Sequence, residues 1–207
     1  MAIENSSFVV HLKTIKEFRR RIIEWYRRYG AHNLPWRNVQ DPWAILVAAY
    51  LLRKTTTKQV ESIYKKFLKR YPNPNAVYKA SEDEIRKLIT PLGMEHKRAK
   101  HIKELARDIV EKFDGHVPTE KVELKRLKGV GNYIASEVLL GAYNKPEPLL
   151  DRNMIRVIER IFSIKSSKPR PHTDPKLWRF AKMLVPQNPE QARQFNYGVL
   201  DFAREIC

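Results

Sequence analysis

Residues 127–151 contain a glycine turn and an aspartate whose types and spacing could serve chemistry on DNA. Gly129 and Gly131 flank Val130, so the backbone can adopt positive φ values and approach a ligand without a Cβ clash. A helix expected to start near Asn132 presents free N–H groups and the positive end of its dipole at the same place. This stretch therefore predicts an anion site suited to a backbone phosphate.

The alternative for the glycine turn is a helical hairpin that merely changes direction there, because an isolated Gly-x-Gly is a weak signal. Leu127 and Val130 are expected to point inward and anchor the loop, and a short helix precedes it. The residues assigned to DNA binding here are Leu127, Lys128, Gly129, Val130, Gly131 and Asn132.

The aspartate of this stretch, Asp151, follows the apolar pair Leu149 and Leu150. A carboxylate there could do chemistry beside a bound DNA strand. The alternative is an Asx-type cap on a helix that begins at about Asn153.

The composition favours a polyanionic partner. Lys and Arg total 40 against 23 Asp and Glu, which gives a net charge of +17 and a pI near 10.0. Such a charge attracts nucleic acid and makes binding depend steeply on salt. A membrane surface is the other common partner of basic chains, but no apolar run of about 18 residues occurs. We therefore expect DNA as the partner and no membrane.

Cysteine usage indicates the compartment. Cys207 is the only cysteine, so no intrachain disulfide can form, and the chain suits a reducing interior. We expect a cytoplasmic, nucleoid-associated prokaryotic protein. The abundance of Lys, Arg, Glu and Ile favours a thermophilic archaeal source.

Helical periodicity dominates the chain, and no convincing alternating strand appears, so the predicted fold class is all-α. Pro72-Asn73-Pro74 is interpreted as a turn. An N-terminal helix is expected to end near Gly30. Further helices are expected over about 44–52, 58–71, 82–89, 95–113, 153–162, 176–185 and 189–206, with short helices around the glycine turn.

Five motifs recur in one order in a known superfamily: LPWR at 34–37, Asp41-Pro42, LLRKTT at 51–56, LKGVGNY at 127–133 and LDRNMIRVIER at 150–160. By these motifs the chain resembles the helix–hairpin–helix DNA glycosylases over roughly residues 18–207. It is most similar to the branch of endonuclease III, the adenine mismatch glycosylases and the archaeal thymine–DNA mismatch glycosylases, and closest to the last.

The resemblance implies two helical domains with a DNA groove between them. A six-helix barrel would span about 40–145, and both ends of the chain, 1–39 and 146–207, would form the second domain. Asp151 matches the catalytic aspartate of the family. A carboxylate there would stabilise the oxocarbenium-like sugar and help activate water as the base leaves.

Tyr133 stands where bifunctional relatives carry a lysine, whose amine forms a Schiff base with the sugar and permits strand cleavage. Tyrosine has no such amine, so the resemblance implies a monofunctional enzyme, with Tyr133 lining the base pocket. The alternative for Tyr133 is a packed aromatic at a helix start. Lys128 is the nearest amine, but its position does not match the lysine nucleophile.

Arg53, Lys54 and Thr55 lie where an apolar helix breaks, and they match the region that fills the gap after base flipping. The alternative is that the two cations are ordinary phosphate-binding or solvent-facing residues. Ala49 replaces a glutamate that adenine mismatch enzymes use to protonate the purine, which argues against adenine. Thymine and uracil leave as stabilised anions and need less acid help.

Cys207 matches the first of four cysteines that hold a [4Fe–4S] cluster in the family. One thiolate cannot hold such a cluster, so we expect no cluster and no catalytic metal unless residues follow Cys207. The leading hypothesis is a monomeric, monofunctional glycosylase that removes thymine or uracil opposite guanine from mismatched duplex DNA. The alternatives are removal of adenine or oxidised pyrimidines, or a non-catalytic DNA-binding module in which Asp151 is only a cap.

Overall fold

The structure, a computed structural model, describes residues 2–5 and 8–207. The described chain divides into two compact units. Unit 1 combines the first residues up to Ala31 with Asn144–Cys207, and unit 2 spans His32–Tyr143. The predicted domain boundaries lie a few residues away, at 39/40 and 145/146, and residues 1, 6 and 7 of the predicted terminal domain lie outside the described part. An autonomous six-helix barrel stays a prediction.

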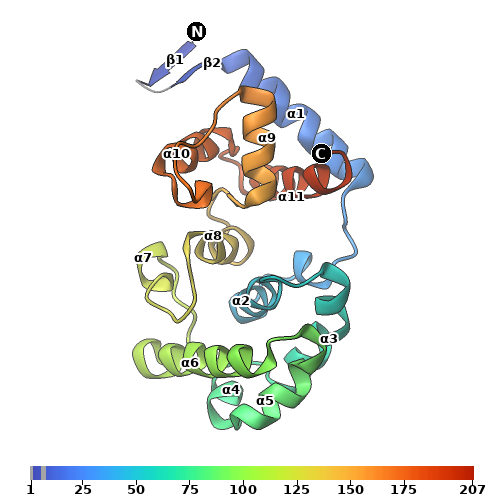
Figure 1. Ribbon diagram of the computed structural model, residues 1–207, viewed down its shortest axis with the longest axis vertical. Coiled ribbons are helices and arrows are strands. Elements are labelled where there is room, and N and C mark those ends of the chain that lie inside the picture. Colours follow the sequence, from blue (N-terminus) through green and yellow to red (C-terminus); the bar gives the residue numbers. More distant parts are fainter. Residues whose placement is uncertain (1, 6–7) are drawn as a thin grey trace. The chain divides into compact units, whose positions relative to one another are not determined.

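Helices make up nearly all regular structure of unit 2 (Figure 1). They are α2 (Pro42–Leu51), α3 (Thr57–Arg70), α4 (Pro74–Lys79), α5 (Glu82–Ile89), α6 (Glu95–Phe113), α7 (Lys121–Leu124) and α8 (Asn132–Gly141).

Side-chain caps fix where several of these helices start. Thr56 and Gln59 form a reciprocal capping box at the head of α3, and Ser81 and Glu84 form another at the head of α5. The chain bends at Pro72 and Asn73 within the predicted turn, but the helix that follows was not predicted, since Asn73 caps α4 and Pro74 is its first residue. Proline is well tolerated at that position, since the first helical N–H has no partner in any case.

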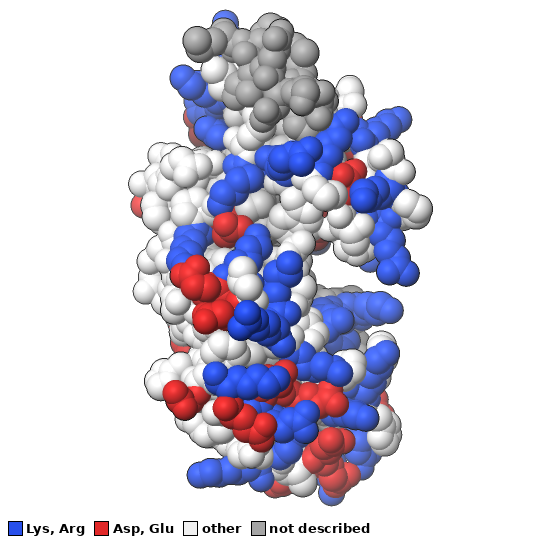
Figure 2. Space-filling model, turned by 90° about the vertical axis from the view of Figure 1, so that its left-hand side faces the viewer, with Lys and Arg blue, Asp and Glu red and all other residues white. Residues whose placement is uncertain are grey.

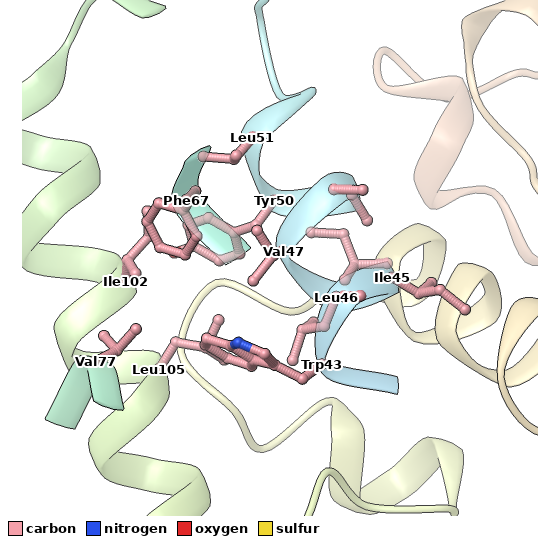
Figure 3. Packing of buried hydrophobic residues seen from close by; sticks show 14 of the residues in the cluster. Trp43, Ile45, Leu46, Val47, Tyr50, Leu51, Phe67, Val77, Ile102 and Leu105 are labelled. Atoms are coloured by element: carbon pink, nitrogen blue, oxygen red, sulfur yellow. The ribbon is translucent and has the colours of Figure 1, made fainter. Parts of the chain in front are cut away.

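The core of unit 2 is built on α2, which is buried on nearly every side. In Figure 3 its Trp43, Val47 and Leu51 lie near apolar side chains of three other helices. Those side chains are Phe67 of α3, Val77 of α4, and Ile102 and Leu105 of α6. Because α2 is apolar all round, it has no solvent-facing side and serves as the central helix of the unit.

Helix α8 runs antiparallel to α2. Gly129, just before α8, lies against Tyr50 and Arg53 at the end of α2, whereas Gly141 at the end of α8 lies against Ile45 near the start of α2. A Cβ at Gly141 would come within 2.8 Å of Ile45 Cδ1, so glycine permits the close approach of the two helices. This pairing sets the glycine turn beside the end of α2.

Unit 1 contains α1 (Leu12–Tyr29), α9 (Arg152–Phe162), α10 (Pro175–Leu184) and α11 (Pro189–Glu205). Its core includes edge-to-face aromatic pairs, with the Phe18 ring 5.3 Å from Phe162 and 5.7 Å from Phe195. The first and last helices of the chain pack along each other, which closes the unit.

The described residues also include a short antiparallel hairpin, β1 (Ala2–Asn5) paired with β2 (Phe8–His11). The expectation of no strand was wrong at this point, because two four-residue strands are too short to give a clear alternating pattern. The all-α fold class is nevertheless confirmed, since the rest of the regular structure is helical.

Candidate active site and nucleic-acid interface

The glycine turn between α7 and α8 has the geometry of an anion site. Gly129 adopts φ +75°, and the Val130 N–H donates to the Leu127 carbonyl at 3.1 Å. Leu127 and Val130 are buried as expected and anchor the turn. The N–H groups of Gly129 and Gly131 have no partner among the described residues, and both glycines are exposed. Two donors are therefore directed to solvent at the start of α8.

Lys128 at the tip of the turn is held by two carboxylates of α6. Its backbone N–H donates to Asp108 Oδ2 at 3.0 Å, and its ammonium lies 3.2 Å from Glu104 Oε2. Neither acid was singled out from the sequence, because both look like ordinary charged positions of an amphipathic helix. Asp108 thus fixes the turn through the backbone, and the predicted contact of Lys128 with DNA stays a prediction.

Arg53 and Lys54 form an exposed loop after α2 that lies beside the glycine turn. The Arg53 guanidinium donates to the Gly129 carbonyl at 3.4 Å and lies over the Tyr50 ring, 5.2 Å from its centroid. Lys54 adopts the left-handed φ of +56°. The structure therefore brings together the Arg53–Lys54 loop and the glycine turn, which the sequence separates by more than seventy residues.

Buried Arg98 at the start of α6 holds this loop, a role that no pattern in the sequence indicated. Its guanidinium donates to the carbonyl oxygens of Gly93, Leu51 and Arg53 at 3.0, 3.3 and 2.7 Å, and also to the Thr55 hydroxyl. Arg98 is thus a positioning residue, and Thr55 faces the protein through this bond. Burial and the neighbouring Arg53 lower the pKa of Arg98.

Tyr133 and Asn132 occupy the first turn of α8 and are half-buried. The Tyr133 side chain packs against the core of unit 2. That packing agrees with the alternative of a structural aromatic, and it leaves the pocket-lining role as a prediction. Ala49, at the position of the family glutamate, is buried in α2 and carries no acid.

Asp151, in unit 1, is the N-cap of α9. Its Oδ1 accepts from the backbone N–H groups of Asn153 at 2.8 Å and Met154 at 3.0 Å. Its Oδ2 accepts from the Asn153 amide at 2.8 Å. Burial raises the pKa of Asp151, and these hydrogen bonds oppose the rise. The capping alternative is therefore realised, and it also holds the carboxylate in one orientation.

The residues present do not fit a four-cysteine cluster. Cys207 is the only cysteine of the printed sequence, and no group of three or more potential metal ligands occurs among the described residues. The one interaction of Cys207 given by the structure is through its carbonyl, which accepts from Arg160 at 3.0 Å.

The surface charge is consistent with a polyanionic partner. Figure 2 shows Lys and Arg side chains spread over one face of the molecule, with Asp and Glu side chains among them. In the part of the chain that the structure describes, no helix is both long and apolar enough to cross a membrane.

Comparisons with known proteins identify the family. Residues 47–183 match the HhH-GPD superfamily of base excision DNA repair proteins. The chain is 62% identical to the thymine-DNA glycosylase of Aeropyrum pernix, over 93% of this chain and 86% of that protein. It is 61% identical to the thymine/uracil-DNA glycosylase of Pyrobaculum aerophilum, over 92% and 83% of the two chains.

A solved structure agrees with these matches. The structure of a thermostable thymine-DNA glycosylase superposes with a TM-score of 0.88 at 35% identity, covering 94% of this chain and 88% of that one. The predicted helix–hairpin–helix glycosylase fold is therefore confirmed. The chain belongs to the HhH-GPD superfamily of base excision DNA repair proteins.

Proposed function

We propose that this protein is a monofunctional DNA glycosylase that hydrolyses the N-glycosidic bond of thymine or uracil mispaired with guanine. The observation that carries the proposal is the Asp151 carboxylate, half-buried and oriented by three hydrogen bonds at the head of α9. The names of the two archaeal relatives, which specify thymine and uracil, support this choice of base.

The proposed role of Asp151 follows from charge development in the reaction. As the base leaves with the bonding electron pair, positive charge builds up on the sugar. A carboxylate held in a partly desolvated position stabilises that charge more strongly than one in water. The same carboxylate accepts a proton from the attacking water, which then forms the bond to C1′.

Tyr133 supports hydrolysis without strand cleavage. The position carries a phenol rather than an amine, so it cannot form a Schiff base with the sugar. The nearest amine of the turn, Lys128, lies 3.2 Å from the Glu104 carboxylate, and its position does not match the lysine nucleophile of the bifunctional enzymes. The proposed product is therefore an intact strand with an abasic site.

DNA would be held by the glycine turn and the loop after α2. The N–H groups of Gly129 and Gly131 are donors suited to a phosphate oxygen. Arg53 and Lys54, exposed at the loop, are the proposed groups that fill the gap left by the flipped base. A thymine or uracil opposite guanine costs less to extrude than a correctly paired base, which supplies part of the selectivity.

The alternatives are disfavoured by particular residues. Ala49 offers no acid to protonate a purine, which counts against adenine, and Tyr133 offers no amine, which counts against the bifunctional enzymes for oxidised pyrimidines. A non-catalytic module in which Asp151 only caps α9 remains the alternative of a different class. We further propose a cytoplasmic monomer; a four-cysteine cluster would require residues after Cys207.

The proposal is tested by incubating the protein with T:G, U:G, A:8-oxoguanine and thymine-glycol duplexes and scoring strand breaks with and without alkali. We expect breaks in the T:G and U:G duplexes only after alkali, because alkali cleaves the abasic product. Breaks without alkali would contradict the monofunctional mechanism. Tight binding without turnover on every duplex would favour the non-catalytic module.

A further inference from the structure

A small cavity of about 120 Å³ lies in unit 2 between the Arg53–Lys54 loop and the start of α6. It is lined by Tyr50, Arg53, Lys54, Lys97, Arg98 and His101, together with one methionine. A single water needs roughly 10–15 Å³ of such space, so the cavity has room for a larger polar group. Its lining is cationic and donor-rich, and it opens to solvent between the exposed side chains of Arg53, Lys54 and Lys97.

Tyr50 lines this cavity, and its hydroxyl forms no hydrogen bond of normal geometry although the Arg53 guanidinium lies nearby. Tyr50 is only 3% exposed, and its oxygen has no partner among the described residues. A buried hydroxyl without a partner costs free energy, so each such group in a folded protein calls for an explanation. Burial raises the pKa of Tyr50, and the hydroxyl therefore remains a proton donor at neutral pH.

Arg98 adds a buried charge with no carboxylate to balance it. Its hydrogen bonds go to three backbone carbonyls and the Thr55 hydroxyl, and it forms no ion pair with the described residues. The neighbouring Arg53 is also cationic and lies over the Tyr50 ring. The free protein thus carries positive charge at this cavity that an incoming anion would offset.

We propose that this cavity binds one backbone phosphate of the DNA, as a second phosphate site beside the glycine turn. The Tyr50 hydroxyl would donate to a non-bridging oxygen, and Lys97 and buried Arg98 would supply charge. The Arg and Lys side chains of the lining can only donate, which suits a phosphate that only accepts. A guanine edge would also require acceptors for its N–H groups, and the lining contains no carboxylate or amide side chain.

The site deepens the proposed function, since it rests on DNA being the substrate, and binding can be measured without excision. The probe is a duplex with a tetrahydrofuran abasic-site analogue, which has no base to remove, in fluorescence anisotropy titrations. A set of such duplexes carries one neutral methylphosphonate at successive backbone positions. Failure to excise thymine would therefore leave this test intact.

Tyr50→Phe removes only the hydroxyl oxygen. We expect it to weaken binding of the unmodified duplex about tenfold, the usual size for a hydrogen bond to a charged group. On the duplex that has its methylphosphonate at the contacted position, Tyr50→Phe and the wild type should bind equally. Unchanged binding of Tyr50→Phe on every duplex would overturn the proposal, as would an equal loss on all of them.

The loss of affinity in Tyr50→Phe could instead depend on the base opposite the analogue and not on the position of the methylphosphonate. That result would assign the cavity to a base and would also overturn the proposal. Tyr64→Phe is the matched control, because the buried Tyr64 hydroxyl donates to the Ala44 carbonyl at 3.2 Å. We expect Tyr64→Phe to lower the Tm and leave DNA affinity unchanged. Tyr50→Phe should not lower the Tm, since its hydroxyl has no partner to lose; a lower Tm with full affinity would mean a structural role.

The charge at the site is tested by salt dependence. Lys97 lines the cavity, whereas Lys100 lies on the same helix and does not. Lys97→Ala should reduce the slope of log K against log salt by about one, the value for one lost phosphate contact. Lys100→Ala serves as the control. Equal slopes for Lys97→Ala and the wild type would contradict a phosphate contact at this cavity.

Discussion

The guanidinium of Arg98 donates to the backbone carbonyl of Arg53 at 2.7 Å, so one buried cation fixes the loop that carries an exposed one. The two guanidinium groups would repel each other, but the Arg98 side chain binds the main chain of Arg53 instead. The loop between α2 and α3 is thereby held against the start of α6, and Arg53 is kept beside the glycine turn.

Arg98→Lys tests this arrangement. Lysine keeps the charge, but its single ammonium cannot serve four acceptors spread over Gly93, Leu51, Arg53 and Thr55. We expect a loss of about 1–3 kcal/mol in the free energy of unfolding, because buried carbonyls lose their donors. Urea denaturation measures it. Arg86→Lys, at an exposed salt bridge with Asp83, is the control and should change the stability little. Equal stability of Arg98→Lys and the wild type would contradict the proposed role of Arg98 in holding the loop.

Two glycine substitutions separate the fold of the turn from its contact with DNA. Gly129→Ala should cost at least about 1–2 kcal/mol, because its φ is +75° and the new Cβ would lie 2.5 Å from the Tyr50 hydroxyl. At Gly131 a Cβ would meet nothing within 4 Å, so Gly131→Ala should keep wild-type stability. We expect Gly131→Ala still to weaken DNA binding, since the Cβ faces the approaching phosphate. Full affinity of Gly131→Ala would count against that contact.

Stability against pH distinguishes Asp151 from an ordinary helix cap. Its pKa in the folded protein is raised, mainly by burial, so ionisation of Asp151 destabilises the fold. This loss of stability develops as the pH rises from the unfolded-state pKa of about 3.9 through the higher folded-state pKa. Asp151→Asn, whose amide oxygen can still accept the two backbone N–H groups, avoids this loss. We therefore expect the Tm of Asp151→Asn, relative to the wild type, to increase from pH 3 to pH 7.

Asp174, the N-cap of α10, is the matched control with the opposite sign. Its pKa is lowered, first by the Ser166 hydroxyl, so its stabilisation is present above about pH 3.9 and is lost as pH falls through the lowered folded pKa. Asp174→Asn should therefore lower the Tm at pH 7 and approach the wild type in acid. Parallel pH curves for the two variants would show that Asp151 is no more than a cap.

Tyr133→Lys tests why the proposed enzyme leaves the strand intact. An amine at this position of α8 should attack the sugar and permit strand cleavage without alkali. We expect a covalent complex with DNA that borohydride traps, which Tyr133→Phe and the wild type should not form. If Tyr133→Lys folds and binds DNA yet forms no trapped complex, Tyr133 does not face the sugar.

Most helices could be predicted from the sequence because their signals are local. The capping box of Ser81 and Glu84, and the glycines of the turn, lie within a few residues of the structure that they specify. The N-cap role of Asp151 was likewise foreseeable from Asn153 two residues later. Helix α4 was missed because Asn73-Pro74 signals a turn and a helix start equally well.

The residues that hold the site in place could not be predicted, because their contacts are not local in the sequence. Arg98 binds the carbonyls of Leu51 and Arg53, 47 and 45 residues away, and backbone carbonyls leave no trace in the residue types. Asp108 accepts from the Lys128 N–H across twenty residues, and Tyr50 looks like one more apolar position of α2. Such contacts depend on how α2, α6 and the glycine turn pack, which periodicity alone does not specify.

The most direct test of the account is single-turnover excision on a T:G duplex by the wild type and by Asp151→Asn, each with and without alkali. We expect the wild-type product to break only after alkali, and Asp151→Asn to bind equally well but to excise at least about 100-fold more slowly. Excision by Asp151→Asn at the wild-type rate would contradict the central claim that this carboxylate drives glycosidic bond cleavage.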